Sequence, residues 1–136
     1  MKKYRIIIAG GRNFDDTYLF ESTVSKYIAD LFSRHQRENP NNMDFTIEVV
    51  SGGASGADSM GEKYASFLGY PVKQFLPNWN LYGRAAGPIR NKQMAEYANE
   101  DGNGILIAFW DGKSKGTKSM IELAKIYGLV IHICKY

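Results

Sequence analysis

Cysteine is nearly absent from this sequence, and so is any long hydrophobic run. Cys134 is the only cysteine among 136 residues, which rules out an internal disulfide and a metal site built on paired cysteines. We interpret Cys134 as a small apolar residue of a last strand and expect no metal. The apolar run that follows the first lysines is too short for a signal-peptide core or a membrane span. We therefore expect a cytoplasmic protein without a membrane partner.

The sequence also lacks a strong excess of charge of one sign. Its net charge is +3, too small by itself to indicate a nucleic-acid coat. Hydrophobic residues make up 44% and charged residues 23% of the chain. These values are close to the globular average and argue against a disordered chain or a membrane protein. The length suits one hydrophobic core, so we expect a single domain over residues 1–136.

Short β-rich runs alternate with longer stretches of helical period. The predicted strands cover residues 4–9, 45–50, 72–76, 104–109 and 129–134. The predicted helices cover residues 17–37, a segment from 60 to 68, residues 88–97 and a segment around 120–127. We predict an α/β fold, a doubly wound, Rossmann-like three-layer sandwich whose five-stranded parallel sheet has the order 3-2-1-4-5.

Several residues indicate where these helices begin and end. Asp15 and Asp16 are candidate caps of the first helix, and Gly69 and Gly128 are candidate ends of the second and the last. Thr117 is a candidate N-cap of the last helix. The expected buried face of the second helix consists of Met60, Tyr64, Phe67 and Leu68.

All strand-to-helix loops of such a sheet open on the same edge, where ligands bind. The unusual segments of the sequence fall in these loops, which are residues 10–14, 51–58, 79–91 and 110–117. The loops of the opposite edge contain only turn formers. We therefore place the functional site at the carboxyl edge of the sheet.

The loop 51–58 is rich in glycine and precedes a helix. Gly52, Gly53 and Gly56 can take positive φ and let a ligand approach main-chain N–H groups at the helix start, which favours an anion. Glycine is also the ordinary solution to a tight connection, and the loop matches neither the dinucleotide-binding fingerprint nor the P-loop. Asp58 either caps the helix or acts as a catalytic carboxylate.

The loop 79–91 and the residue after it carry Arg84, Arg90 and Lys92 and no acidic residue. The arginines can fork onto phosphate or carboxylate oxygens, and the alternative is a solvated basic surface. A helix start at Gly87 would add free N–H donors beside them.

Other residues of the last two loops each allow two interpretations. Asn91 caps a helix or orients a base, and Trp79 and Tyr82 are packing residues or base-stacking platforms. Lys113 and Lys115 form a solvated rim that steers anions. The hydroxyl of Thr117 either accepts a hydrogen bond from a backbone N–H of its helix or contacts a phosphate.

The sequence resembles the SLOG superfamily of Rossmann-like nucleotide-binding proteins, and within it the YspA, cpYpsA-related family. The resemblance covers nearly the whole chain and rests on residues 10–14, on 51–58, on Trp79 with 82–91 and Met94, and on 108–110 with 116–117. It implies a Rossmann-like fold and a nucleotide-derived ligand, without an established reaction. Asn13 stands where the family usually has Asp. The resemblance and the many aromatic residues are compatible with a homodimer, and the oligomeric state stays open.

We predict that the chain binds a nucleotide or a nucleotide derivative, such as an ADP-ribose or NAD-related ligand, at the carboxyl edge. A role as a sensor stays open, and no cofactor is certain. The predicted ligand-binding residues are Gly10, Gly11, Arg12, Asn13, Ser51, Gly52, Gly53, Gly56, Asp58, Arg84, Gly87, Arg90, Asn91, Trp110, Gly116 and Thr117.

Relatives in the superfamily suggest two alternatives. The DprA proteins bind single-stranded DNA and carry a block similar to residues 51–58, so a nucleic-acid-binding module is the first alternative. The LOG phosphoribohydrolases, which hydrolyse a glycosidic bond in a nucleotide, suggest the second. No nucleophile is paired with a base here, because His35 and His132 fall away from the ligand edge. The catalytic residues are unknown, an enzyme is not favoured, and only Asp58 and Asp111 are candidate general bases.

The residue after the last predicted loop argues against the hydrolase. LOG enzymes place a glutamate three residues after the threonine of a Gly-Thr pair, and that position is Met120 here. Methionine cannot ionise, and Glu122 is rotated by about 200° around the helix from it. We predict no release of free base from nucleoside monophosphates.

Overall fold

The structure of the protein, a computed structural model, describes all 136 residues. Five strands form one parallel sheet in the order β3-β2-β1-β4-β5, which confirms the predicted topology. The strands are β1 (Lys2–Gly10), β2 (Phe45–Ser51), β3 (Val72–Gln74), β4 (Gly104–Trp110) and β5 (Val130–Lys135). The helices are α1 (Thr17–Glu38), α2 (Ala57–Leu68), α3 (Trp79–Tyr82), α4 (Ala86–Ala98) and α5 (Lys115–Ile126), with a 3-10 turn, η1 (Gly83–Ala85), before α4.

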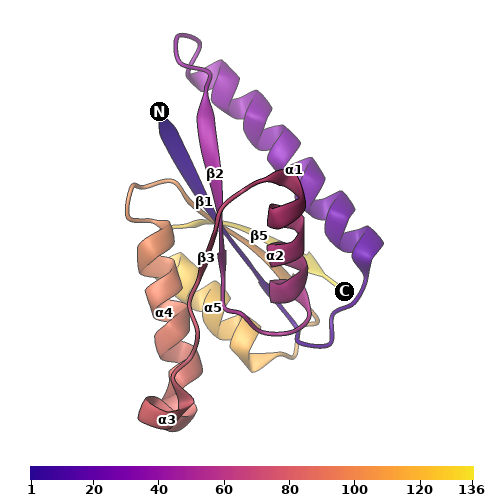
Figure 1. The fold of residues 1–136 in the computed structure, drawn as a ribbon, viewed down its shortest axis with the longest axis vertical. Coiled ribbons are helices and arrows are strands. Elements are labelled where there is room, and N and C mark those ends of the chain that lie inside the picture. Colours follow the sequence, from indigo (N-terminus) through magenta and orange to yellow (C-terminus); the bar gives the residue numbers. More distant parts are fainter.

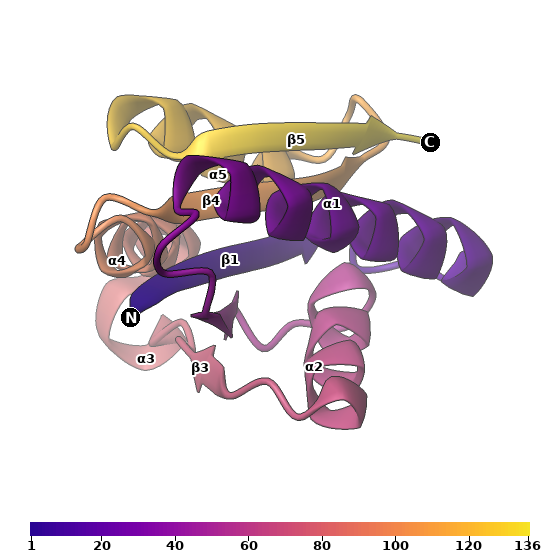
Figure 2. The ribbon, with the colours of Figure 1, turned by 90° about the horizontal axis from the view of Figure 1, so that it is seen from above.

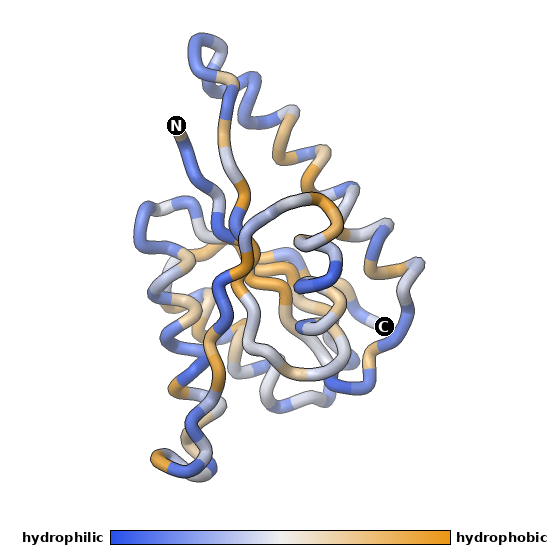
Figure 3. Tube along the Cα trace, in the orientation of Figure 1, coloured by the Kyte–Doolittle hydropathy of each residue, from blue (hydrophilic) through white to orange (hydrophobic).

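The central strands form the core because both of their faces are covered. Six of the seven residues of β4 are buried, and only Trp110 is half-buried. Strands buried on both faces read as continuous apolar runs in parallel sheets, and Figure 3 shows the hydrophobic segments gathered in the middle of the molecule.

Two layers of helices enclose this sheet, α1 and α2 on one face and α4 and α5 on the other (Figures 1 and 2). Phe20, Val24 and Ile28 of α1 belong to the first buried cluster. Met94 of α4 and Met120 of α5 belong to the second. The chain therefore has the predicted three-layer α/β architecture. None of its helices combines the length and the apolar character that crossing a membrane requires.

The buried face of α2 differs from the prediction. Ala57, Gly61 and Ala65 face the sheet, and a Cβ at Gly61 would lie 3.0 Å from the side chain of Ile8. Phe67, which was expected on this face, is 88% exposed. Leu68 is also exposed, while Met60 and Tyr64 are half-buried. Small residues bring the helix close to the sheet and leave Phe67 and Leu68 exposed, so the prediction was wrong for these two residues. Met60 and Tyr64 pack against the first buried cluster.

The helix boundaries are mostly those expected from the sequence. The carboxylate of Asp16 accepts a hydrogen bond from Leu19 N at the start of α1, and Gly69 ends α2 in the left-handed conformation. Gly128 has positive φ just after α5. Thr117 is not the cap of α5, because that helix begins earlier and Ser114 caps it by accepting from Thr117 N.

The segment between β3 and α4 is not a long polar loop. It contains α3 and η1, whose last turn runs into α4 so that Ala86 N donates to Gly83 O. The start of α4 is therefore continuous with a preceding turn and does not offer the full set of free N–H donors that was expected at Gly87.

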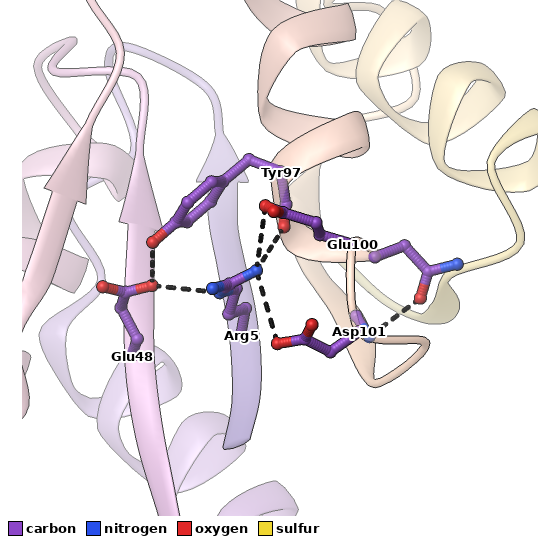
Figure 4. A network of polar contacts seen from close by, with 7 residues as sticks. Arg5, Glu48, Tyr97, Glu100 and Asp101 are labelled. Carbon is purple, nitrogen blue, oxygen red and sulfur yellow. Dashed lines mark hydrogen bonds and ion pairs between the residues drawn. The ribbon is translucent and has the colours of Figure 1, made fainter. Parts of the chain in front are cut away.

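The opposite edge of the sheet contains more than turn formers. Arg5 of β1 forms ion pairs with Glu48 of β2 at 3.3 Å and with Glu100 and Asp101 of the α4–β4 loop. Tyr97 donates a hydrogen bond to Glu48, and the Arg5 guanidinium lies over the ring of Tyr97 (Figure 4). Only 12% of each of the Arg5 and Glu48 side chains is exposed. This network joins β1 and β2 to the end of α4 and the loop that follows it.

Candidate functional site

A cleft of about 550 Å³ lies at the carboxyl ends of the strands. Its walls come from the loop after β1, the loop after β2, the α3–α4 segment, the start of α5 and Tyr136. The sequence-predicted residues that line it are Gly10, Gly11, Arg12, Asn13, Asp58, Arg84, Gly87, Arg90, Asn91, Gly116 and Thr117. The parallel topology thus brings most of the predicted set to one place, and their contact with a ligand stays a prediction.

The other predicted residues lie beside or behind this cleft. Gly52 and Gly53 border a second hollow of about 380 Å³, which shares Arg12 and Arg90 with the cleft. The remaining three residues, Ser51, Gly56 and Trp110, line neither space.

These three residues support the loops that line the cleft. The buried hydroxyl of Ser51 donates to Glu62 at 2.6 Å and accepts from Gly53 N. Gly56 has a φ of 75°, and its Cα packs directly against the Gly11 carbonyl, where a Cβ would overlap. The indole N–H of Trp110 donates to Ser114 O. Their contacts are with the protein itself.

Arg90 joins two loops that are far apart in the sequence. Its guanidinium donates to Gly52 O at 2.6 Å and to Asn91 Oδ1 at 2.9 Å. A Cβ at position 52 would collide with the guanidinium and lie 2.9 Å from a carboxylate oxygen of Asp58. Burial lowers the pKa of Arg90 from its ordinary value, and arginine stays charged at neutral pH because that value is so high. The remaining N–H groups of this side chain form no hydrogen bond within the protein.

Asp58 lies beneath this arginine and is only 6% exposed. One of its carboxylate oxygens accepts from Ala54 N at 3.2 Å, so it orders the loop before α2. No side chain caps the first turn of α2, so Asp58 does not act as the N-cap considered from the sequence. Burial raises the pKa of Asp58 to about 6, and the Ala54 N–H and Arg90 oppose that rise.

Asn91 connects the start of α4 to the start of α5. Its Oδ1 accepts from Arg90, and its amide nitrogen donates to Gly116 O at 3.3 Å. The side chain is 5% exposed. Asn91 therefore positions Arg90 and the Gly116 carbonyl relative to each other, and it caps no helix.

Arg12 and Arg84 are the two arginines of the cleft whose side chains bind no other protein group. Both are exposed and line the cleft, and neither forms a salt bridge or a side-chain hydrogen bond. Lys115 also lines the cleft, whereas Lys92 lies outside it and pairs with Glu96. The free guanidinium groups are suited to bind oxygens of phosphate or carboxylate.

Asp111 is bound within its own loop. One carboxylate oxygen accepts from Lys113 N and Ser114 N, both at 2.8 Å. The backbone N–H of Ser114, followed by that of Lys113, lowers the pKa of this exposed carboxyl. A lowered pKa weakens a carboxylate as a base, so the geometry favours a turn-forming role for Asp111.

Tyr136 and Glu62 are two site residues that the sequence analysis missed. The ring of Tyr136 stacks at a tilt on Phe14 at 4.7 Å, and its hydroxyl lies against Gly11. Because β5 runs parallel to the other strands, its carboxyl end also reaches the ligand edge. The rule that located the four loops would have found Tyr136. Glu62 supports Ser51 from a helix position and left no comparable signal.

The cleft is lined by more cationic than carboxylate side chains. No group of three or more His, Cys, Asp or Glu side chains is arranged to hold a metal ion. His35 is buried in α1 against the Tyr4 hydroxyl at 2.9 Å, and His132 lies on β5, so neither lines the cleft. Met120 lines it and Glu122 does not, as the helical spacing predicts.

Comparison with known proteins supports the resemblance inferred from the sequence. Over 132 residues the chain is 29% identical to the Gene 61 protein of Mycobacterium phage D29, an alignment that covers 93% of both chains. No solved structure matches the chain. Residues 4–82, more than half of the chain, match the family described as YAcAr, the YspA, cpYpsA-related SLOG family. The chain therefore belongs to the YspA, cpYpsA-related SLOG family.

Proposed function

We propose that this protein binds a nucleotide or a nucleotide derivative in the cleft at the carboxyl edge of the sheet. The observation that carries the proposal is that the cleft has unpaired positive side chains, whereas its carboxylates are hydrogen-bonded within the protein. The cleft is lined by Arg12, Arg84, Arg90 and Lys115 and by two carboxylates, Asp58 and Asp111. Both carboxylates accept hydrogen bonds from their own loops, whereas Arg12 and Arg84 have no partner.

The backbone around the cleft supports an anionic ligand as well. The first turn of α2 has no side-chain cap. Its Ala57 N–H donates to Gly11 O, and the N–H groups of a helix start that have no partner attract anions. The volume of about 550 Å³ lies within the usual range for small-molecule pockets. Membership of a SLOG family is consistent with a nucleotide-related ligand.

A thermal-shift screen over nucleotides, dinucleotides and ADP-ribose compounds tests this proposal. A ligand present at a hundred times its dissociation constant should stabilise the protein by about 2.7 kcal/mol. The control is the double variant Arg12→Ala/Arg84→Ala, which keeps the internal bonds of the site and should lose the shift. Absence of a shift for every compound in the wild-type protein would refute the proposal.

One observation favours hydrolysis of a nucleotide glycosidic bond as a second candidate function. Asp58 lines the cleft and its pKa is raised to about 6, which suits a group that must donate a proton near neutral pH. Against this candidate, the position of the LOG glutamate is occupied by Met120, which lines the cleft and is 1% exposed.

Chromatography of nucleoside monophosphates incubated with the protein distinguishes binding from hydrolysis. We expect no release of free base over hours at high protein concentration. Release in proportion to protein concentration that Asp58→Asn abolishes would identify a hydrolase with Asp58 as its acid or base. Release that Asp58→Asn leaves unchanged would point to a contaminating enzyme.

A further inference from the structure

A second hollow adjoins the main cleft and shares Trp79 with it. It lies between the loop after β2 and the segment that follows β3, and it holds about 380 Å³. Leu76, Pro77 and Trp79 form its apolar part, and the Leu76 side chain lies against Gly53. Arg12 and Arg90 border both spaces, so the two hollows meet at a pair of cations.

Trp79 is an exposed aromatic side chain without a partner in the protein. It is 50% exposed, its ring stacks on no other aromatic ring, and its indole N–H forms no hydrogen bond. The other tryptophan, Trp110, donates to Ser114 O and lies under the ammonium group of Lys135. Leu76, which is 64% exposed, lines the same hollow, and exposed apolar side chains that are grouped beside polar residues mark a binding surface.

The residues around Trp79 hold it in place. Asn78 caps α3 by accepting from Leu81 N at 3.1 Å, which fixes the helix that carries the ring. Gly87 lies close to the ring, so that a Cβ there would be 3.7 Å from the outer edge of the indole. The tryptophan is therefore positioned from two sides and open on the side of the two hollows.

We propose that the second hollow binds the heterocyclic base of the ligand, stacked on Trp79, with the adjoining phosphates between Arg12 and Arg90. The proposal rests on the nucleotide-binding function proposed above and assigns an orientation to the ligand. Stacking on an indole is favourable for every base because every base has a π-face. The apolar part suits the base, and the junction of cations suits the phosphates. The ribose that joins base and phosphates lies between them, and any group attached beyond the phosphates extends into the main cleft.

Tryptophan fluorescence tests the stacking directly, because the chain has only two tryptophans. ADP, GDP, CDP and UDP are titrated into the wild-type protein, Trp110→Phe and Trp79→Phe, with excitation where the bases do not absorb. We expect quenching in the wild type and in Trp110→Phe and its loss in Trp79→Phe. Quenching that disappears in Trp110→Phe and persists in Trp79→Phe would overturn the proposal.

A comparison of ligands with and without a base gives a second readout. Trp79→Ala should weaken the binding of a nucleoside diphosphate by about five- to a hundredfold and leave the affinity for ribose 5-phosphate unchanged. Trp79→Phe should retain most of the affinity because phenylalanine also stacks. Circular dichroism checks the fold of both variants, and the half-exposed position of Trp79 makes unfolding unexpected.

The two proposals fail in different ways. If nucleotides bind wild type and Trp79→Ala equally, or if ribose 5-phosphate loses affinity to the same extent, the base is not stacked on Trp79 although the nucleotide site stands. If no nucleotide binds the wild-type protein, the proposed function itself is wrong, and the assignment of the base falls with it.

Discussion

Arg90 lines the proposed ligand site and also bonds to Gly52, which lies 38 positions earlier in the sequence. Its removal should therefore affect both ligand binding and stability. Its bond to the Gly52 carbonyl is internal to the protein, so the side chain contributes to stability as well as to ligand binding. Arg84 lines the same cleft without an internal bond. The pair therefore allows the two contributions to be separated.

Arg90→Ala should lower nucleotide affinity by about ten- to a hundredfold, because a charge-assisted hydrogen bond is lost. It should also lower the free energy of unfolding by about 1–3 kcal/mol, since the Gly52 carbonyl loses its partner. Arg84→Ala, the matched control, should lower affinity and leave stability unchanged. Calorimetric titration and urea denaturation measure both quantities. Unchanged affinity in Arg90→Ala would remove this arginine from the ligand site.

Asp58 should make the stability of the protein depend on pH in an unusual direction. Burial raises its pKa from 3.8 to about 6, so the folded protein retains a proton that the unfolded chain releases between these values. Rising pH across that window therefore lowers the free energy of unfolding. Above about pH 6, the group destabilises the fold by about 3 kcal/mol relative to its protonated form.

Asp58→Asn tests this dependence, because asparagine cannot ionise and its side-chain oxygen can still accept from Ala54 N. The variant should gain stability relative to wild type as the pH rises from about 4 to 6, and denaturation at several pH values measures that difference. Asp111→Asn is the control. The pKa of Asp111 is lowered, so its removal should act in the opposite direction. A difference between wild type and Asp58→Asn that stays constant with pH would contradict the raised pKa.

Individual site residues could be predicted only as far as the parallel-sheet rule reaches. The rule places loop residues such as Arg12 and Thr117 at one edge without any knowledge of contacts. It cannot show that Ser51 faces Glu62, or that Arg90 reaches Gly52, because such pairs depend on how helices pack across the sheet. Ser51, Gly56 and Trp110 were consequently grouped with the ligand-binding residues although they support the loops from behind.

At the scale of the element, α2 has two faces at helical spacing, one of bulky and one of small residues, and either could be expected to pack on the sheet. Its bulky residues and its small residues both recur at helical spacing, and sequence periodicity favours the bulky set. The structure packs Gly61 against Ile8 and leaves Phe67 exposed. Close approach to the sheet decides between the faces, and that distance is not visible in the sequence. The segment of α3 and η1 escaped prediction because it is too short to show a period.

The start of α2 requires glycine at position 56, so a single added methyl group should disturb it. Gly56 has φ 75° and ψ −128°, a conformation open essentially to glycine alone. A Cβ at this position would also overlap the backbone of Gly11 and lie 2.7 Å from the backbone of Arg12. The contact locks the loop after β1 to the loop after β2.

Gly56→Ala should therefore destabilise the protein more than Gly69→Ala at the other end of the same helix. Gly69 has φ 78° and no atom within 4 Å of an added Cβ, so its substitution should cost only the left-handed strain, about 1–2 kcal/mol. Gly56→Ala adds the overlap with Gly11 to a less favourable backbone conformation. Chemical denaturation of both variants measures the difference. Equal losses of stability would show that the two loops are not locked by this contact.

At the scale of the whole molecule, the two edges of the sheet carry opposite chemistry. The amino edge has the nearly buried Arg5–Glu48 pair, whose charges compensate each other, whereas the carboxyl edge has arginines without partners. The alternation of strands and helices and the handedness of crossovers were enough to predict this sheet order. The network around Arg5 was not predictable, because its members come from three separate segments of sequence (Figure 4).

The carboxyl edge must be distinguished from a surface for single-stranded DNA, and salt dependence does this. A protein that neutralises several phosphates of a single strand releases a counterion at each, so its affinity falls steeply as salt rises, with a slope of about −0.7 per phosphate. The cations that line the cleft are Arg12, Arg84, Arg90 and Lys115, and the net charge of the chain is +3. We therefore expect a shallow salt dependence for nucleotide binding and no tight binding of DNA at physiological salt.

Fluorescence anisotropy of a labelled single strand at two salt concentrations tests this. Submicromolar binding with a steep slope would favour a nucleic-acid-binding module, because a few cations around a single cleft contact few phosphates.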